Sequence, residues 1–261
     1  VENGKHVVTA NKKLLAEYGN EIFALAGRKN VMVQFEAAVA GGIPIIKALR
    51  EGMSANRIKS IMGIINGTSN FILSEMREKG SPFAQVLKQA QELGYAEADP
   101  TFDIEGHDAG HKITIMSALA FGTPVNFGAC YLEGISKLDA RDIRYAEELG
   151  YRVKLLGITR LSEKGVELRV HPSLVPSKRL LANVEGVDVA KEVVPDALGE
   201  PGGGVLHQLE PPGLAEVEVG QLGMGLRDRD RPRPERAQRD AGLVAREHPR
   251  ALGLRGPPGL E

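Results

Sequence analysis

Short apolar runs and longer amphipathic stretches alternate along the first two thirds of the chain. The apolar runs have the length and β-branched content of buried strands, and the longer stretches repeat their apolar positions with helical spacing. The predicted strands cover residues 6–10, 31–38, 58–65, 152–160 and 166–171. The predicted helices cover residues 12–26, 44–51, 70–79, 83–93, 108–121 and 140–149. This alternation predicts an α/β fold with a mixed sheet and helices on one of its faces.

The pattern divides the chain into three parts. Residues 1–30 contain one strand and one helix, which is most simply the C-terminal edge of a Rossmann-like, doubly wound nucleotide-binding domain. Residues 31–187 form the predicted substrate-binding and catalytic domain. Because the chain begins at Val1 without a methionine, directly before a strand, we expect it to be a piece of a longer protein.

The C-terminal part, residues 188–261, differs in composition. It contains no Ser, Thr, Asn, Ile, Phe, Tyr or Trp, and Gly, Pro, Arg, Leu, Glu and Val dominate it. Such a segment buries too little apolar surface to offset its chain entropy, so we expect it to be largely disordered. Out-of-frame translation of a GC-rich region is one explanation, and an Arg-rich binding arm is the other, although interleaved acidic residues weaken the latter.

Composition excludes several classes of function. The formal net charge is −1, which gives no electrostatic footprint for nucleic acid or an anionic membrane. No apolar run reaches the length of about 18 residues that a membrane span needs. The single cysteine, Cys130, cannot form an internal disulfide, which fits a reducing cytoplasm. No Cys/His cluster indicates zinc.

The candidate chemistry lies in residues 94–112, where several acidic side chains precede one lysine at the start of an apolar helix. Asp108 and Lys112 are four residues apart and therefore share a face of that helix. Beside an apolar core, carboxylates can bind a cationic substrate and a lysine can donate or accept a proton. The alternative is an exposed ion pair, which would be the better interpretation without the surrounding motif.

Four motifs resemble those of homoserine dehydrogenases: residues 4–12 (GKHVVTANK), 35–44 (FEAAVAGGIP), 63–70 (GIINGTSN) and 94–112. The resemblance covers residues 1–187, and residues 170–176 are similar to the closing strand of that family. It implies an oxidoreductase that interconverts L-homoserine and L-aspartate 4-semialdehyde with NADP or NAD, in threonine, methionine and isoleucine biosynthesis. It also implies a homodimer formed through the sheet domain.

Two departures from the family pattern bear on activity. The Gly-x-Gly turn that holds the cofactor pyrophosphate is not among residues 1–30, and the loop that returns to the cofactor does not follow residue 187. We therefore expect a homoserine dehydrogenase fragment that lacks most of its nucleotide-binding domain. An inactive substrate-binding or dimerisation module is the alternative.

The resemblance assigns roles to charged side chains. Lys112 matches the proton-donor lysine, and Lys12 matches a second lysine where cofactor and substrate meet. Glu97 and Asp108 match carboxylates that bind the substrate's α-ammonium group, and Asp103 joins their network. For Lys12, the alternative is a solvated lysine in the first turn of a helix, where the helix dipole disfavours a cation.

Further assignments by resemblance concern the backbone. Thr68 binds substrate or simply starts a helix, and Gly94 lets the backbone approach the cofactor or simply ends one. A sodium ion is expected on backbone oxygens of Glu36, Val39, Gly41 and Ile43.

Other reactive side chains are given no catalytic role. His107 and His111 are expected at the surface. No base neighbours Cys130 in sequence, which argues against dehydrogenases that acylate a cysteine.

Overall fold

The computed structural model describes residues 1–186, 190–195 and 217–219. Its N-terminal part is a βαβ unit of β1 (Val7–Val8), α1 (Lys12–Lys29) and β2 (Val33–Gln34). The two strands are parallel, with Val7 opposite Val33. The side chain of Asn11 caps α1 by accepting a hydrogen bond from the Leu14 N–H at 2.9 Å. The predicted β-α step is therefore present, and its assignment to a nucleotide-binding domain stays a prediction.

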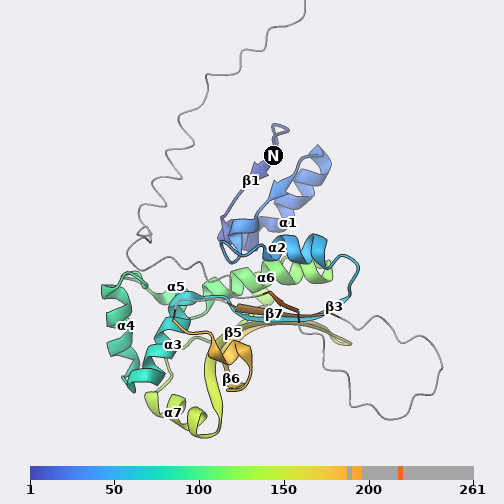
Figure 1. The fold of residues 1–261 in the computed structure, drawn as a ribbon. Helices are drawn as coiled ribbons and strands as arrows, with labels where there is room; N and C mark the ends of the chain where they lie inside the picture. The colour runs from blue at the N-terminus through green and yellow to red at the C-terminus, as the bar shows by residue number, and fades with distance from the viewer. Residues whose placement is uncertain (187–189, 196–216, 220–261) are drawn as a thin grey trace, which may run out of the picture. The chain divides into compact units, whose positions relative to one another are not determined.

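Among the described residues, the main sheet has six strands in the order β4-β6-β5-β3-β7-β8. Figure 1 labels β3, β5, β6 and β7 of this sheet. Their bounds are β3 (Ile58–Ile64), β4 (Tyr131–Leu132), β5 (Tyr151–Ser162), β6 (Gly165–Pro176), β7 (Ala190–Pro195) and β8 (Val217–Val219). The β4–β6 pair is parallel and the other pairs are antiparallel. The predicted mixed sheet is confirmed.

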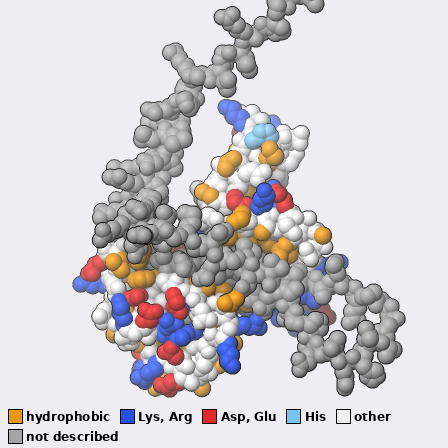
Figure 2. All heavy atoms as spheres, viewed as in Figure 1, with side chains coloured by type: hydrophobic (Ala, Val, Ile, Leu, Met, Phe, Trp, Pro, Cys, Tyr) orange, Lys and Arg blue, Asp and Glu red, His pale blue; other side chains and the backbone are white. Residues whose placement is uncertain are grey.

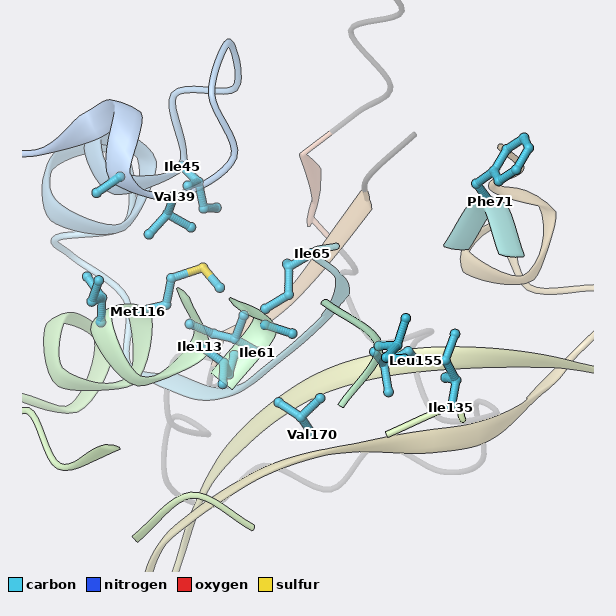
Figure 3. Packing of buried hydrophobic residues seen from close by; sticks show 14 of the residues in the cluster. Val39, Ile45, Ile61, Ile65, Phe71, Ile113, Met116, Ile135, Leu155 and Val170 are labelled. Atoms are coloured by element: carbon cyan, nitrogen blue, oxygen red, sulfur yellow. The ribbon is translucent and has the colours of Figure 1, made fainter. Parts of the chain in front are cut away.

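The α-helices after β3 are α3 (Gly67–Lys79), α4 (Phe83–Glu92), α5 (Thr101–Ile104), α6 (His107–Phe121) and α7 (Ala140–Glu148). The buried apolar residues of α3 and α6, together with Ile143 of α7, belong to one core cluster. Figure 3 shows Ile113 and Met116 of α6 facing this core near Ile61 and Val170. The α-helices therefore pack on one face of the sheet, as the sequence predicts.

The opposite face of the sheet carries a second, smaller apolar cluster beside the 3-10 helix η4 (Leu180–Asn183). Neighbouring residues of β5 divide between the two clusters: Leu155 belongs to the first and Leu156 to the second. This division follows from the alternation of side chains along a strand. Because both faces are covered, residues 61–64 of β3 and 155–158 of β5 carry no charged or polar side chain, which accounts for the apolar runs in the sequence.

The predicted strand at residues 31–38 is too long. Only Val33–Gln34 is a strand, and the chain then turns into the 3-10 helix η1 (Glu36–Ala38). The Glu36 carboxylate accepts the N–H groups of Ile46 at 2.8 Å and Lys47 at 2.9 Å. It thereby satisfies unpaired donors at the start of α2 (Ile45–Lys47), which continues as the π-helix η2 (Ala48–Gly52).

Several other predicted bounds need correction. The third helix begins at Gly67 and not at residue 70, because Asn66 is its N-cap. Strand β6 continues to Pro176, beyond the predicted end at residue 171. It pairs with β4 only at Arg169 and Val170. Beyond those residues no described strand pairs with its outer side, and such an edge strand tolerates Pro172 and Pro176. Helix α5 and strand β4 were not predicted.

The prediction of a disordered C-terminal tail is wrong at two places. Residues 190–195 form β7 on β3, and residues 217–219 form β8 on β7. The free edge of β3 offers unpaired backbone groups, and the valines of VAKEVVP suit a strand. The rest of the tail prediction, for residues 196–216 and 220–261, lies outside the described residues.

The surface carries charges of both signs. On the face drawn in Figure 2, lysine and arginine side chains are interspersed with aspartate and glutamate. Among the described residues, no helix is both long and apolar enough to cross a membrane.

Candidate active site

Asp108, in the first turn of α6, lies between two lysines. Its Oδ2 atom is 2.6 Å from Nζ of Lys112, and its Oδ1 atom is 3.1 Å from Nζ of Lys12. The residue is only 4% exposed. Lys112 also donates a hydrogen bond to the backbone oxygen of Ile65 at 2.8 Å. The ion pair of Asp108 and Lys112 is thus largely buried, and Lys12 joins it as a third member. It is not the exposed ion pair of the alternative interpretation.

A second acid joins this group through an amide. The side-chain nitrogen of Asn66 donates to Oδ2 of Asp108 at 2.9 Å and to Oδ1 of Asp103 at 2.7 Å. Its oxygen accepts the N–H of Ser69 at 2.8 Å, which caps α3. Two acids, two lysines and one asparagine therefore form a connected network, called here the acid–lysine cluster: Lys12, Asn66, Asp103, Asp108 and Lys112.

The environment moves the pKa values of the two acids in opposite directions. Burial by itself raises the pKa of Asp108, but the charge and hydrogen bond of Lys112, the hydrogen bond of Asn66 and the charge of Lys12 hold it below its ordinary value. Burial, with a smaller contribution from the negative charge of Asp108, raises the pKa of Asp103 above its ordinary value. The Asn66 hydrogen bond and the charges of Lys112 and Lys12 offset this only in part. Asp108 is therefore the stable anion of the cluster.

Four elements deliver these side chains. Strand β3 ends at Ile64 and places Ile65 and Asn66 at its carboxyl end. Helix α5 carries Asp103, α6 carries Asp108 and Lys112, and the first residue of α1 is Lys12. Helix α6 contacts both β3 and α1. Its first two turns reach α1 through the Asp108–Lys12 ion pair and the end of β3 through the Lys112–Ile65 hydrogen bond.

The aromatic neighbours of the cluster were missed by sequence reasoning. Nζ of Lys12 lies 5.7 Å from the ring centroid of Phe102. His111 is 2% exposed and packs edge-on against Phe127, with 4.2 Å between ring centroids. Its predicted surface position is therefore wrong, because its face of α6 meets Phe102 and Phe127. Burial lowers the pKa of His111 below its ordinary value.

Three other predicted site residues lie outside the acid–lysine cluster. The hydroxyl of Thr68 donates to the backbone oxygen of Tyr95 at 2.8 Å, which links the start of α3 to the segment after α4. Glu97 is exposed, and its carboxylate makes no hydrogen bond or ion pair among the described residues. Gly94 has φ +76°, and a Cβ atom there would meet nothing within 4 Å. The space beside this position is therefore open, and its role in binding the cofactor stays a prediction.

The predicted sodium loop turns tightly at two positions, one of which is a glycine. Ala40 and Gly42 have φ values of 48° and 86°. The backbone oxygens of Glu36 and Ile43 accept hydrogen bonds from Val39 at 3.3 Å and from Ile45 at 2.8 Å. The Glu36 carboxylate is engaged with α2. Side chains of the described residues form no cluster of three or more His, Cys, Asp or Glu that could hold a metal.

An apolar hollow of about 410 Å³ lies elsewhere, between α1, the end of α6 and residues 122–125. Phe23, Phe35, Ile115 and Leu119 are among its lining residues. The lining contains no charged side chain, so this hollow is distinct from the acid–lysine cluster.

Comparison with known proteins identifies the family. The homoserine dehydrogenase family model matches residues 44–208. The chain belongs to the homoserine dehydrogenase family. The match extends past residue 187, where the sequence resemblance was expected to stop, and it includes β7.

Named relatives agree with this family. The homoserine dehydrogenase of Neisseria gonorrhoeae is 81% identical over 200 residues, which are 77% of this chain and 46% of the relative. That of Pseudomonas aeruginosa is 66% identical over 199 residues, 76% of this chain and 46% of the relative. The chain therefore spans less than half the length of these relatives.

Solved homoserine dehydrogenases share the fold. The crystal structure of the enzyme from Thiobacillus denitrificans has a TM-score of 0.74 and 70% identity, covering 76% of this chain and 46% of that one. A hyperthermophilic archaeal homoserine dehydrogenase in complex with NADPH has a TM-score of 0.63 and 33% identity, covering 76% and 59%.

Proposed function

We propose that this chain supplies the substrate-binding and proton-handling part of an enzyme that interconverts L-homoserine and L-aspartate 4-semialdehyde. The observation that carries the proposal is the position of one buried carboxylate, Asp108, between the ammonium groups of Lys12 and Lys112. Three of the four motifs that resemble the family supply the cluster residues, and the family match includes four of these five residues.

Lys112 is the proposed proton donor to the aldehyde oxygen. An ammonium group has three N–H donors, and the described contacts of Lys112 use two of them, on Asp108 and Ile65. The third is free for a substrate oxygen. As that oxygen gains negative charge during reduction, an adjacent cation stabilises the transition state more than the ground state. In the reverse direction, the same nitrogen accepts the proton of the homoserine hydroxyl.

The other cluster residues orient this lysine and the substrate. Both oxygens of Asp108 already accept hydrogen bonds or ion pairs, so we assign Asp108 chiefly to holding the two lysines. Asp103 and the exposed Glu97 then provide carboxylate oxygens for the substrate's α-ammonium group. Thr68 is assigned to the substrate side of the same region, beside Tyr95.

A pyridine nucleotide fits beside Lys12. In open α/β sheets, ligands bind outside the carboxyl ends of parallel strands, and Lys12 follows the carboxyl end of β1 in the β1–α1–β2 unit. When bound, NADP or NAD supplies or accepts the hydride of the reaction. Lys12 would hold the reacting end of this cofactor, and the open backbone at Gly94 would approach it.

Further properties of the family are proposed for this protein. Backbone oxygens of Glu36, Val39, Gly41 and Ile43 are the candidates for a sodium site. The sheet domain is the candidate site of homodimer formation. A cytoplasmic role in threonine and methionine biosynthesis follows from the proposed reaction, and the single cysteine fits that compartment.

Calorimetry and turnover test the function. We expect the chain to bind L-homoserine, and to reduce NADP⁺ or NAD⁺ with homoserine when its nucleotide site is complete. Homoserine binding without turnover at saturating cofactor would indicate the alternative, a substrate-binding module. No homoserine binding by a folded chain would contradict both.

A further inference from the structure

Asn66 joins the two acids of the cluster. Its side chain is buried, with 5% exposure, and both acceptors of its NH₂ group are carboxylate oxygens: Oδ1 of Asp103 at 2.7 Å and Oδ2 of Asp108 at 2.9 Å. One amide nitrogen therefore connects a residue of α5 to a residue of α6. Hydrogen bonds to ionised acceptors are stronger and more directional than those between neutral groups.

We propose that Asn66 is a positioning residue that holds Asp103 and Asp108 in register and thereby sets the direction of the Lys112 ammonium. This inference rests on the proposed function for its catalytic meaning. The structural part of the proposal is that one amide influences the pKa values of both acids. This influence can be measured without turnover.

The end of β3 fixes the amide and the lysine together. Ile65 offers its backbone oxygen to Lys112, and the next residue, Asn66, offers its amide to the acids. Two neighbouring residues on one rigid strand end thus contact the cation and both anions. A shift of the Asn66 side chain would release Asp108 from one of three partners and leave Asp103 without its closest donor.

The electrostatic consequence differs between the two acids. A donor to an ionised carboxylate favours the charged form. For Asp103, the Asn66 hydrogen bond is the strongest influence that lowers the pKa against burial. The charges of Lys112 and Lys12 lower the pKa of both acids, and the charge of Asp108 raises that of Asp103. For Asp108, the charge and the hydrogen bond of Lys112 each lower the pKa more than the Asn66 hydrogen bond does. Removal of the amide is therefore expected to raise the pKa of Asp103 more than that of Asp108.

The capping role of Asn66 is separable from this positioning role. Its Oδ1 atom accepts the Ser69 N–H, and serine is about as good an N-cap as asparagine. Asn66→Ser therefore keeps an acceptor for α3 and removes the NH₂ donor. Asn66→Asp keeps the acceptor and the shape, but places a third carboxylate beside Asp103 and Asp108.

The experiment is a pH titration of the side-chain carboxyl ¹³C resonances of Asp103 and Asp108 in this chain. We expect Asn66→Ser to move the Asp103 midpoint to higher pH, with a smaller upward shift for Asp108. Asn70→Ser is the matched control, because this buried amide of the same helix donates to the backbone oxygens of Val184 at 3.2 Å and Gly186 at 3.0 Å. It should leave both midpoints unchanged.

Unchanged midpoints in Asn66→Ser would overturn the proposal. If that variant does not fold, Asn66→Asp decides: a higher Asp103 midpoint, from the added negative charge, supports the proposal and an unchanged one overturns it.

Turnover separates this inference from the proposed function. In the active form of the protein, Asn66→Ser should lower kcat by about tenfold to a hundredfold, as expected for a misplaced catalytic group. Shifted midpoints with normal kcat would overturn the positioning role. A parent protein that does not bind homoserine would contradict the proposed function, and the titration would still report on the amide.

Discussion

The ammonium of Lys112 donates a hydrogen bond to the backbone oxygen of Ile65 at 2.8 Å, across 47 positions of sequence. This bond ties the second turn of α6 to the end of β3. A second N–H of the lysine donates to Asp108, so one of its three donors is left for a substrate. The direction of that donor is therefore set by the contact between a helix and a sheet, as well as by helical spacing.

Replacement of Lys112 by methionine should remove most of the turnover in the active form of the protein. Methionine keeps much of the apolar length but cannot donate a proton, and loss of a general acid costs about a hundredfold or more in kcat. The measurement is steady-state oxidation of homoserine. Lys79→Met is the control, because Lys79 pairs with Glu75 at the same i,i+4 spacing on an exposed part of α3. Normal turnover by the Lys112 variant would refute its assigned role.

Asp108→Asn should destabilise the folded chain. The amide has the same shape but no charge, so two ammonium groups lose a largely buried anion, at a cost of about 3 kcal/mol in the free energy of unfolding. Urea denaturation measures this change. Asp139→Asn, at the exposed N-cap of α7, should change stability little, because asparagine caps as well as aspartate. Equal stability of the two variants would show that the charge of Asp108 is not structurally important.

Lys154, on the other side of the sheet, should make the free energy of unfolding depend on pH. Its ammonium is buried among Asn70, the backbone oxygen of Val184 and Glu185, and burial lowers its pKa from 10.5 to about 8. Between these values, the unfolded chain binds a proton that the folded chain has released. Stability should therefore rise with pH across this window.

The comparison with Lys154→Met isolates this effect. Arg77 and Arg152 also influence this lysine and remain in the variant. The free energy of unfolding of the parent should rise relative to that of the variant between pH 8 and pH 10.5. A constant difference across this range would show that Lys154 keeps its ordinary pKa.

Gly134 lets a loop approach α5 closely. A Cβ atom at this position would lie 2.5 Å from the backbone oxygen of Ile104 and 2.6 Å from Cα of Glu105. Because both are backbone atoms, Gly134→Ala should displace the end of α5, with a loss of roughly 1–3 kcal/mol of stability. We also expect weaker homoserine binding, since Asp103 lies in the displaced helix.

Gly128→Ala is the control for this substitution, because its Cβ atom would only touch the Asn126 side chain at 3.6 Å. Thermal unfolding of both variants tests the prediction. Equal melting temperatures would show that the loop at Gly134 adjusts without moving α5.

Local patterns were sufficient for most elements of the first 176 residues. Helices such as Phe83–Glu92 have clear periodicity and end signals, so their position follows from nearby residues alone. The same holds for the i,i+4 relation of Asp108 and Lys112, which depends only on the helix that carries them.

Long-range contacts decided the rest. The 3-10 helix at Glu36–Ala38 exists because the Glu36 carboxylate reaches the start of α2, and β7 exists because β3 has a free edge. The residues next to Glu36 and those within β7 do not indicate that these segments will contact α2 and β3. The tail residues 190–195 were misjudged for this reason, since their composition reveals nothing about the edge that pairs with them.

The sequence by itself determined which residue types are available for chemistry and which of them share a helix face. Only the tertiary structure decided that Lys12 and Lys112 meet on one carboxylate and that Asn66 joins this carboxylate to Asp103. It also left Glu97 exposed, with no hydrogen bond or ion pair to this cluster among the described residues. The physical reason is that helix periodicity orders neighbours four residues apart, whereas contacts across 37 or more positions form only when the packed core brings separate elements together.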